Sequence, residues 1–177
     1  MVEISDLSIV IAAISVSLAA FYYIFNMRHA IRTREMDACR YLTQFTTSER
    51  TNQSFAIISR LEWKDPEDFY KKYWYSNPEM FGRINSWFFV AENLGILVKH
   101  KIASAETIYD MGGWVFIHQW DKYSACINWR RELPRQTMGR EYMKNFEFLA
   151  QELEKVGQRR DPNFRNRLEG YRKNLKS

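Results

Sequence analysis

The chain has 177 residues, with 26 Lys and Arg against 21 Asp and Glu, and a formal net charge of +5 at pH 7. Aromatic residues make up 16% of the chain, a content that supports a packed core and excludes a disordered protein. The two cysteines, Cys39 and Cys126, are far apart and in no metal-binding spacing. A disulfide framework is therefore excluded, and a reducing compartment is favoured.

An uncharged apolar segment, residues 7–27, lies near the start of the chain. At about 1.5 Å per residue, a helix of this length just crosses a hydrocarbon core of about 30 Å. A cleaved signal peptide would begin with basic residues, whereas Glu3 and Asp6 precede this segment and the aromatic Phe21 and Tyr22 occupy its end. A buried core helix is the other alternative, but aromatics gathered at one end favour a membrane interface. We predict an uncleaved transmembrane anchor.

The charges around the anchor predict its orientation. Four arginines follow it closely, and no basic residue precedes it: Arg28, Arg32, Arg34 and Arg40. Cytoplasmic flanks of membrane spans are enriched in basic residues. The expected protein is single-pass in the cell membrane, with its N-terminus outside and the bulk of the chain in the cytoplasm.

One face of the anchor carries small side chains. Ser8, Ala12, Ser15 and Ala19 recur at helical spacing and align along one stripe. Small residues let two membrane helices approach closely, and serine hydroxyls can bond across the gap. This stripe is a predicted helix-packing face, although Ala and Ser are also simply common in membrane spans.

Beyond the anchor, every strong local signal indicates helix. Asp65-Pro66, Asn77-Pro78 and Asp161-Pro162 each pair a favourable N-cap with proline, and Ser104 begins a further helix. Leu133-Pro134 predicts a helix end. The expected helices are the anchor to about residue 45, then 49–63, 66–73, 78–99, 105–133, 139–156 and 163–175.

The apolar periodicity agrees with an all-α fold. The clearest stripe, at spacings of three and four, contains Tyr142, Phe146, Leu149, Leu153 and Val156. Such helices predict a compact cytoplasmic bundle behind the transmembrane helix. The expected divisions are a transmembrane anchor (1–27), a basic juxtamembrane helix (28–46), a helical cytoplasmic domain (47–157) and a basic C-terminal helix or tail (158–177).

Two charged residues lie where the sequence is otherwise apolar or aromatic. Glu92 interrupts the apolar residues 88–98, and Arg130 follows Trp129 near the end of a long predicted helix. A buried acid requires a partner. One hypothesis is that Glu92 and Arg130 form a buried ion pair; the other is that Glu92 points to solvent.

The sequence contains no recognisable catalytic or cofactor motif. His29, His100 and His118 are isolated from any second ligand at helical spacing, and the phosphate-binding glycine loops and the nucleophile elbow are absent. Gly112-Gly113 stands inside a helical pattern, where it favours close packing or a kink. We therefore expect no enzyme, no cofactor and no metal.

The aromatic residues 63–89 mix rings with lysines. Core packing is the favoured interpretation. A contact with a membrane or a protein comes next, and stacking on nucleic-acid bases is the least favoured.

The C-terminal residues 155–177 hold eight basic and two acidic residues, so they account for the whole net positive charge. This segment could contact anionic lipid, an acidic partner or nucleic acid, or be a solvated face without a role. The residues predicted to make a membrane or partner contact are Arg159, Arg160, Arg165, Arg167, Arg172 and Lys173.

The order of these features resembles an uncharacterised family of single-span membrane proteins, known only as a domain of unknown function. The resemblance rests on the span and its basic flank, on residues 88–98 around Glu92, on the Trp-containing helix 116–131, and on the Asn-Phe-Glu-x-Leu-Ala motif at 145–150. It implies a fold and a topology but no activity. The basic tail after Val156 is not part of it.

The expected function is that of a non-enzymatic accessory or scaffolding subunit of a membrane protein complex. Its partners would be membrane lipids and other subunits, or a second copy through the span; nucleic acid is the least favoured partner. The alternative is a membrane-tethered signalling or defence component whose cytoplasmic helical domain senses a ligand.

Overall fold

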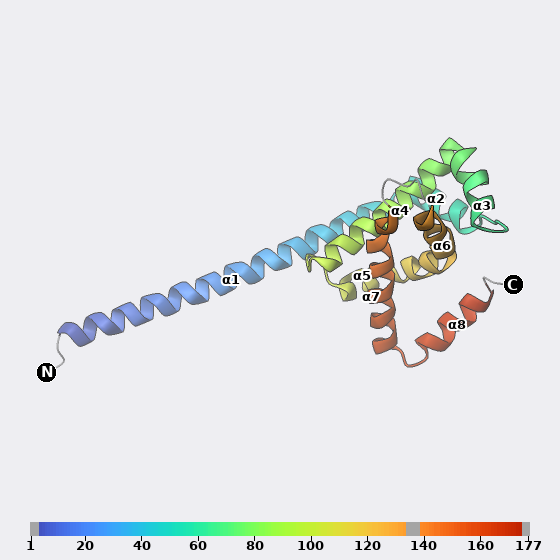
Figure 1. Ribbon diagram of the computed structural model, residues 1–177. Helices are drawn as coiled ribbons and strands as arrows, with labels where there is room; N and C mark the ends of the chain where they lie inside the picture. The colour runs from blue at the N-terminus through green and yellow to red at the C-terminus, as the bar shows by residue number, and fades with distance from the viewer. Residues whose placement is uncertain (1–3, 134–138, 175–177) are drawn as a thin grey trace. The chain divides into compact units, whose positions relative to one another are not determined.

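The computed structural model describes residues 4–133 and 139–174, and all of its regular structure there is helical, as predicted (Figure 1). The chain divides into two compact units, Met1–Asp37 and Ala38–Ser177. The elements in chain order are α1 (Ile4–Thr47), α2 (Glu49–Ser59), α3 (Pro66–Phe69), η1 (Tyr70–Tyr75), α4 (Pro78–Lys99), α5 (Ala105–Ile108), η2 (Tyr109–Gly113), α6 (Trp114–Glu132), η3 (Gly139–Glu141), α7 (Lys144–Arg160) and α8 (Phe164–Asn174). The finer divisions at residues 27, 46 and 157 stay predictions.

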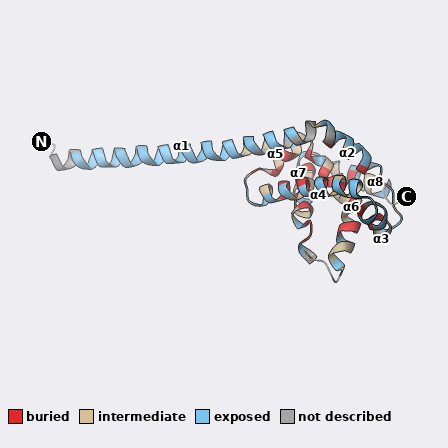
Figure 2. Ribbon diagram, turned by 90° about the horizontal axis from the view of Figure 1, so that it is seen from above, coloured by how far each residue is buried: buried red, intermediate tan, exposed pale blue. Residues whose placement is uncertain are grey.

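Helix α1 contains the apolar N-terminal segment. Its 44 residues correspond to about 66 Å of helix, roughly twice the thickness of a hydrocarbon core. Residues 8–34 are all exposed (Figure 2). The candidate membrane span is Ser8–Tyr41, and none of its most apolar residues is buried inside the protein. The buried-core alternative for this segment is therefore wrong.

Helix α2 starts where Ser48 accepts a hydrogen bond from the Thr51 amide, and it ends earlier than the predicted residue 63. Its last turn is closed by side chains from α6. The Tyr123 hydroxyl donates to the Ile58 carbonyl at 2.6 Å, and Lys122 Nζ donates to the Ser59 carbonyl. Because these carbonyls already have partners in α6, the helix can stop at Ser59.

The segment after α2 packs aromatic rings into the core. Asp65 caps α3 by accepting from the Asp68 amide, with Pro66 at the first helical position, as predicted. The backbone then widens into the π-helical η1, which buries Tyr70 and Trp74. The favoured core interpretation of this aromatic segment is confirmed at these positions.

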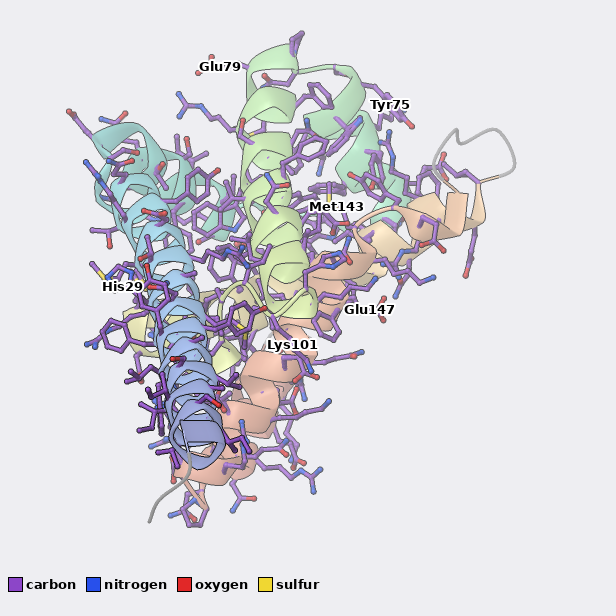
Figure 3. All side chains as sticks on the ribbon, turned by 90° about the vertical axis from the view of Figure 1, so that its left-hand side faces the viewer. His29, Tyr75, Glu79, Lys101, Met143 and Glu147 are labelled. Carbon is purple, nitrogen blue, oxygen red and sulfur yellow. The ribbon has the colours of Figure 1, made fainter. Side chains whose placement is uncertain are left out.

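Helix α4 forms the centre of the domain and packs against α7. Asn77 caps its start through a bond from the Met80 amide. Gly95 allows the close approach of the two helices, because a Cβ atom there would overlap the carbonyl oxygen of Asn145. In Figure 3, Lys101 marks the chain just after α4, and Met143 and Glu147 mark the start of α7.

The predicted helix 105–133 has the right extent but is interrupted. Ser104 caps α5, and the chain kinks in η2 where Gly112 adopts a φ of +87°. Gly113 then packs against Ile108 with no room for a Cβ atom. Both predicted roles of the glycine pair, a kink and close packing, are confirmed. Helix α6 ends at Glu132, directly before Leu133.

Helix α7 carries the stripe predicted to be apolar, but it starts and ends later than the predicted 139–156. All five residues of that stripe are buried: Tyr142, which lies just before α7, and Phe146, Leu149, Leu153 and Val156 within it. The later start follows from Met143, which has a left-handed backbone with φ of 53° and so cannot continue a helix. The buried residues of α4, α6 and α7 form most of the core, and side chains of α2, α3, η1 and α8 add to it (Figure 2).

Candidate functional site

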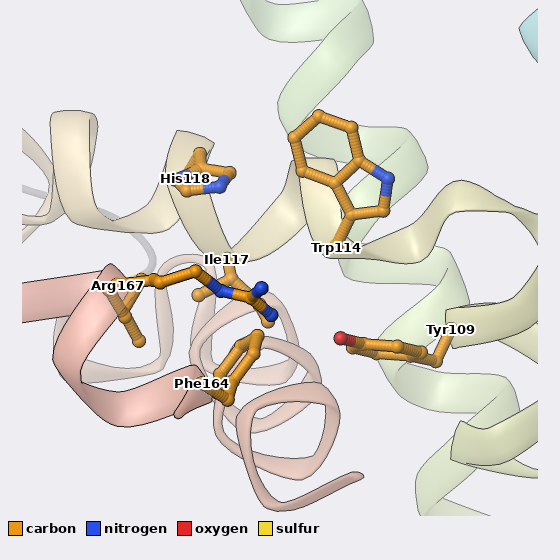
Figure 4. Close-up of a pocket in the computed structure, with 7 residues that line it drawn as sticks. Tyr109, Trp114, Ile117, His118, Phe164 and Arg167 are labelled. Carbon is orange, nitrogen blue, oxygen red and sulfur yellow. The ribbon is translucent and has the colours of Figure 1, made fainter. Parts of the chain in front are cut away.

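A cavity of about 310 Å³ lies in the helical domain between the start of α6 and α8 (Figure 4). Its apolar lining comes from η2, α6 and α8 and consists of Tyr109, Trp114, Ile117, Phe164 and Leu168. Its two nitrogen-containing polar side chains are His118 and Arg167. Apolar walls with a few converging polar groups are the usual composition of a small-molecule pocket.

His118 is half-buried on α6 at the edge of this cavity. Its ring contacts that of Tyr171 at a centroid distance of 4.0 Å and that of Trp114 at 5.3 Å. Its Nδ1 atom is buried and has no hydrogen-bond partner among the described residues. Burial lowers the pKa of His118, with Arg172 acting in the same direction and Asp121 opposing it. The imidazole is therefore neutral at pH 7.

Helix α8 is fastened to the domain at both of its ends. At its start, the Phe164 ring packs so closely on Gly157 of α7 that a Cβ atom there would lie 2.6 Å from the ring. Towards its end, Arg172 donates to Asp121 of α6 and to Glu154 of α7, each at 2.9 Å. The middle of α8 contributes Arg167 and Leu168 to the cavity.

Most of the basic residues predicted to contact a membrane or a partner form ion pairs within the chain. Arg165 and Lys173 are exposed. Each of the other four forms an ion pair within the chain: Arg159 with Glu106, Arg160 with Asp110, Arg167 with Asp161 of the same segment, and Arg172 with Asp121 and Glu154. The segment still has a net positive charge, but much of it neutralises acids of the same chain. A contact with lipid or with a partner stays a prediction.

Glu92 does not pair with Arg130. Its carboxylate accepts a bond from the Asn145 side-chain amide and one from the Phe146 backbone amide, both at 2.8 Å. Phe146 is the third residue of α7, whose own N-cap, Met143, provides no side-chain bond. Because the first amides of a helix lack partners within it, Glu92 of α4 acts as the cap of α7.

Arg130 is held by aromatic rings instead. Its guanidinium lies 4.5 Å from the ring centroid of Trp74, 5.3 Å from that of Tyr70 and 5.1 Å from that of Tyr142. Such stacking stabilises a partly desolvated guanidinium without a carboxylate. The ion pair in this region is made by the neighbouring Arg131, which contacts Glu147 at 2.8 Å. The predicted Glu92–Arg130 pair is therefore wrong.

The small-residue stripe of the anchor, Ser8, Ala12, Ser15 and Ala19, lies on α1 and is exposed. The Ser15 hydroxyl donates to the Ile11 carbonyl of the same helix at 2.8 Å, so it is satisfied without a second helix. Bonds of this kind are common for serine in helices. The stripe as a packing face stays a prediction.

A second hollow, of about 460 Å³, lies between α2 and the start of α4. Its main charged groups already bind one another: Arg83 donates to Glu79 at 2.8 Å and to the Ser54 hydroxyl at 3.2 Å.

Neither a nucleophile nor a metal centre stands out in the part of the chain that the structure describes. Burial raises the pKa of the Cys126 thiol to about 12, so the thiolate required for reactivity is not formed near neutral pH. No group of three or more His, Cys, Asp or Glu side chains among the described residues could hold a metal ion.

Reasoning from the sequence missed the cavity and the place of His118 in it. The available signal was the spacing Trp114–His118, which puts both rings on one helical face directly after the glycine pair. The third wall could not be inferred, because Phe164 comes from a helix fifty residues later.

The fold defines a helical domain that follows one N-terminal helix long and apolar enough to cross a membrane. A model of the family described as a domain of unknown function (DUF4760) matches residues 6–153, so the chain belongs to this family. The resemblance inferred from the sequence is confirmed, including the exclusion of the basic tail. No curated protein and no solved structure matches the chain.

Proposed function

We propose that this protein is a membrane-anchored, non-enzymatic accessory or scaffolding subunit of a membrane protein complex. The observation that carries the proposal is the exposed apolar surface of α1, where large side chains such as Ile9, Val16 and Phe21 are 66–72% exposed. Exposed apolar area costs about 25 cal/mol per Å² in water, so a surface of this extent requires lipid or another helix around it.

The proposed orientation places the domain in the cytoplasm. It is supported by the four arginines that follow the apolar segment and by the acidic residues before it. A fluorescent protein fused to the C-terminus tests it, since the fusion fluoresces on the cytoplasmic side only. A dark fusion at normal protein levels would contradict the orientation.

A partner-binding role is supported by large aromatic side chains that remain exposed on the domain. Tyr75 is 62% exposed, Trp114 51% and Phe89 46%. Aromatic residues are enriched in protein–protein interfaces. The part-buried charged groups Glu92 and Arg130 are engaged in holding the fold, through the start of α7 and the aromatic rings respectively.

The test is extraction of the full chain from its native membrane in mild detergent, followed by native mass spectrometry. We expect a defined complex or a homo-oligomer; a lone monomer would overturn the proposal. Ala12→Ile on the small stripe should weaken association through the span, whereas Ala13→Ile on the neighbouring face should not. Equal effects of the two variants would remove the stripe from the proposal.

A second candidate function is ligand sensing by the membrane-tethered domain. The cavity beside α8 favours it, because its volume lies at the lower end of the range of about 300–1,000 Å³ for small-molecule pockets. Thermal unfolding of the full chain with a metabolite library tests this function. The absence of any stabilising compound would count against it.

A further inference from the structure

Three aromatic side chains from separate elements surround the cavity beside α8. The rings of Tyr109 and Phe164 are in edge-to-face contact, at a centroid distance of 6.4 Å with an interplanar angle of 62°. Trp114 remains 51% exposed although it lies at the mouth of an apolar cavity. Ring faces and edges of this kind are suited to holding a flat ring by stacking.

The polar groups of the cavity favour an acidic ligand. Figure 4 shows the Arg167 side chain extending across the cavity towards the space between Phe164 and Tyr109. Its guanidinium has five N–H donors, and Asp161 accepts through one nitrogen only. The remaining donors can bind a carboxylate or phosphate at two points. His118 also lines the cavity, but its Nδ1 atom is buried, so Arg167 is the group that would meet an anion.

We propose that this cavity binds a compact planar aromatic anion, with its ring between Trp114, Tyr109 and Phe164 and its acidic group on Arg167. The volume of about 310 Å³ limits the ligand to one or two rings. This inference deepens the ligand-sensing function and rests on it.

Helix α8 builds one side of this site. It provides Phe164, Arg167 and Leu168, and it begins beyond residue 153, where the family match ends. The cation and one aromatic wall thus lie outside the residues that the family model matches. The site is specific to a chain that carries α8 docked through Arg172.

The experiment is isothermal titration calorimetry on the full chain in lipid nanodiscs, with the heats from empty nanodiscs subtracted. Three probes separate the contributions: 2-naphthoate, its neutral analogue 2-naphthalenemethanol, and the non-aromatic anion cyclohexanecarboxylate. We expect 2-naphthoate to bind at least about tenfold more tightly than either of the others, because only it satisfies both the rings and Arg167.

The variants assign the heat to the cavity. Arg167→Gln and Trp114→Ala should each weaken 2-naphthoate binding by roughly tenfold or more, since they remove the charged bond and one stacking wall. Arg165→Gln on the same helix and Phe89→Ala on α4 are matched controls, and both should leave binding unchanged.

Binding that the cavity variants do not change, or no binding of any probe, would overturn the inference. Equal affinity for the naphthoate and its neutral analogue would overturn the anionic ligand class, while leaving a ligand-binding cavity and the sensing function in place. The sensing function itself fails only if the metabolite screen also finds no stabilising compound.

Discussion

The bond from Glu92 to the start of α7 makes a direct prediction about stability. Glu92→Ala removes the acceptor of both the Asn145 side-chain amide and the Phe146 backbone amide. A hydrogen bond to a charged group contributes about 1.5–3 kcal/mol, and an amide left without a partner costs about 1–3 kcal/mol when buried. Since Glu92 is only partly buried, we expect a loss of about 2–3 kcal/mol for the pair of bonds.

For a chain of this size, 1 kcal/mol corresponds to about 2–4 °C in Tm, so Glu92→Ala should lower Tm by about 4–12 °C. Glu92→Gln keeps one acceptor and should lose about 1 kcal/mol. Thermal unfolding of the full chain in detergent, followed by near-UV circular dichroism, reports on the aromatic packing of the domain and so measures this loss.

The matched control is Glu79→Gln, an acid on the same helix whose side chain is 78% exposed and forms an ion pair with Arg83. Exposed pairs of this kind contribute at most about 0.5 kcal/mol, so its Tm should stay within about 2 °C of the parent chain. If Glu92→Ala behaves like Glu79→Gln, Glu92 does not cap α7 and the reasoning is refuted.

Further predictions concern glycines and the half-buried histidine. Gly95→Ala should destabilise the domain severely, because the new Cβ atom would overlap the Asn145 carbonyl. Gly82→Ala, in open space on the same helix, should instead raise the free energy of unfolding by about 0.5–1 kcal/mol. Thermal unfolding compares the two variants, and equal shifts in Tm would contradict the close approach of α4 and α7. Gly157→Ala should loosen α8 by displacing the ring packed on it, seen as faster proteolysis after residue 160; unchanged cleavage would contradict this contact. Because the pKa of His118 is lowered from 6.5 in the folded chain, the unfolded chain binds more protons and stability should fall as the pH drops through 6.5. His118→Gln should reduce the decrease in Tm between about pH 7.5 and about pH 5.5. If the substitution leaves that decrease unchanged, groups other than His118 cause it.

Local signals predicted the helical elements well because their causes lie within a few residues. Asp65, Asn77 and Ser104 each accept a bond from an amide three residues later, so the sequence alone indicates where these helices begin. The end of α2 was predicted too late, because Tyr123, far along the chain, closes it at Ile58. Local patterns carry no information about such a contact.

The sequence indicated correctly that Glu92 and Arg130 lie in unusual surroundings, but the partners predicted for them were wrong. Glu92 needed a partner in its apolar surroundings, and the sequence indicated this need, yet its partners are an amide side chain and a backbone amide of α7. A backbone donor is present at nearly every position, so no residue type identifies it. Arg130 likewise stacks on aromatic rings and does not pair with an acid. The aromatic residues before α4 are evident in the sequence, but not their proximity to Arg130.

The place where the family match ends, at residue 153 in the middle of α7, has an evolutionary consequence. A relative that stops near this point would leave the α6 surface bearing His118 and Asp121 open to water, without the Tyr171 ring and the Arg172 guanidinium that now cover it. The presence of α8 and the residues at positions 118 and 121 should therefore vary together among relatives, so that an alignment sorted by C-terminal length would separate two classes of this domain.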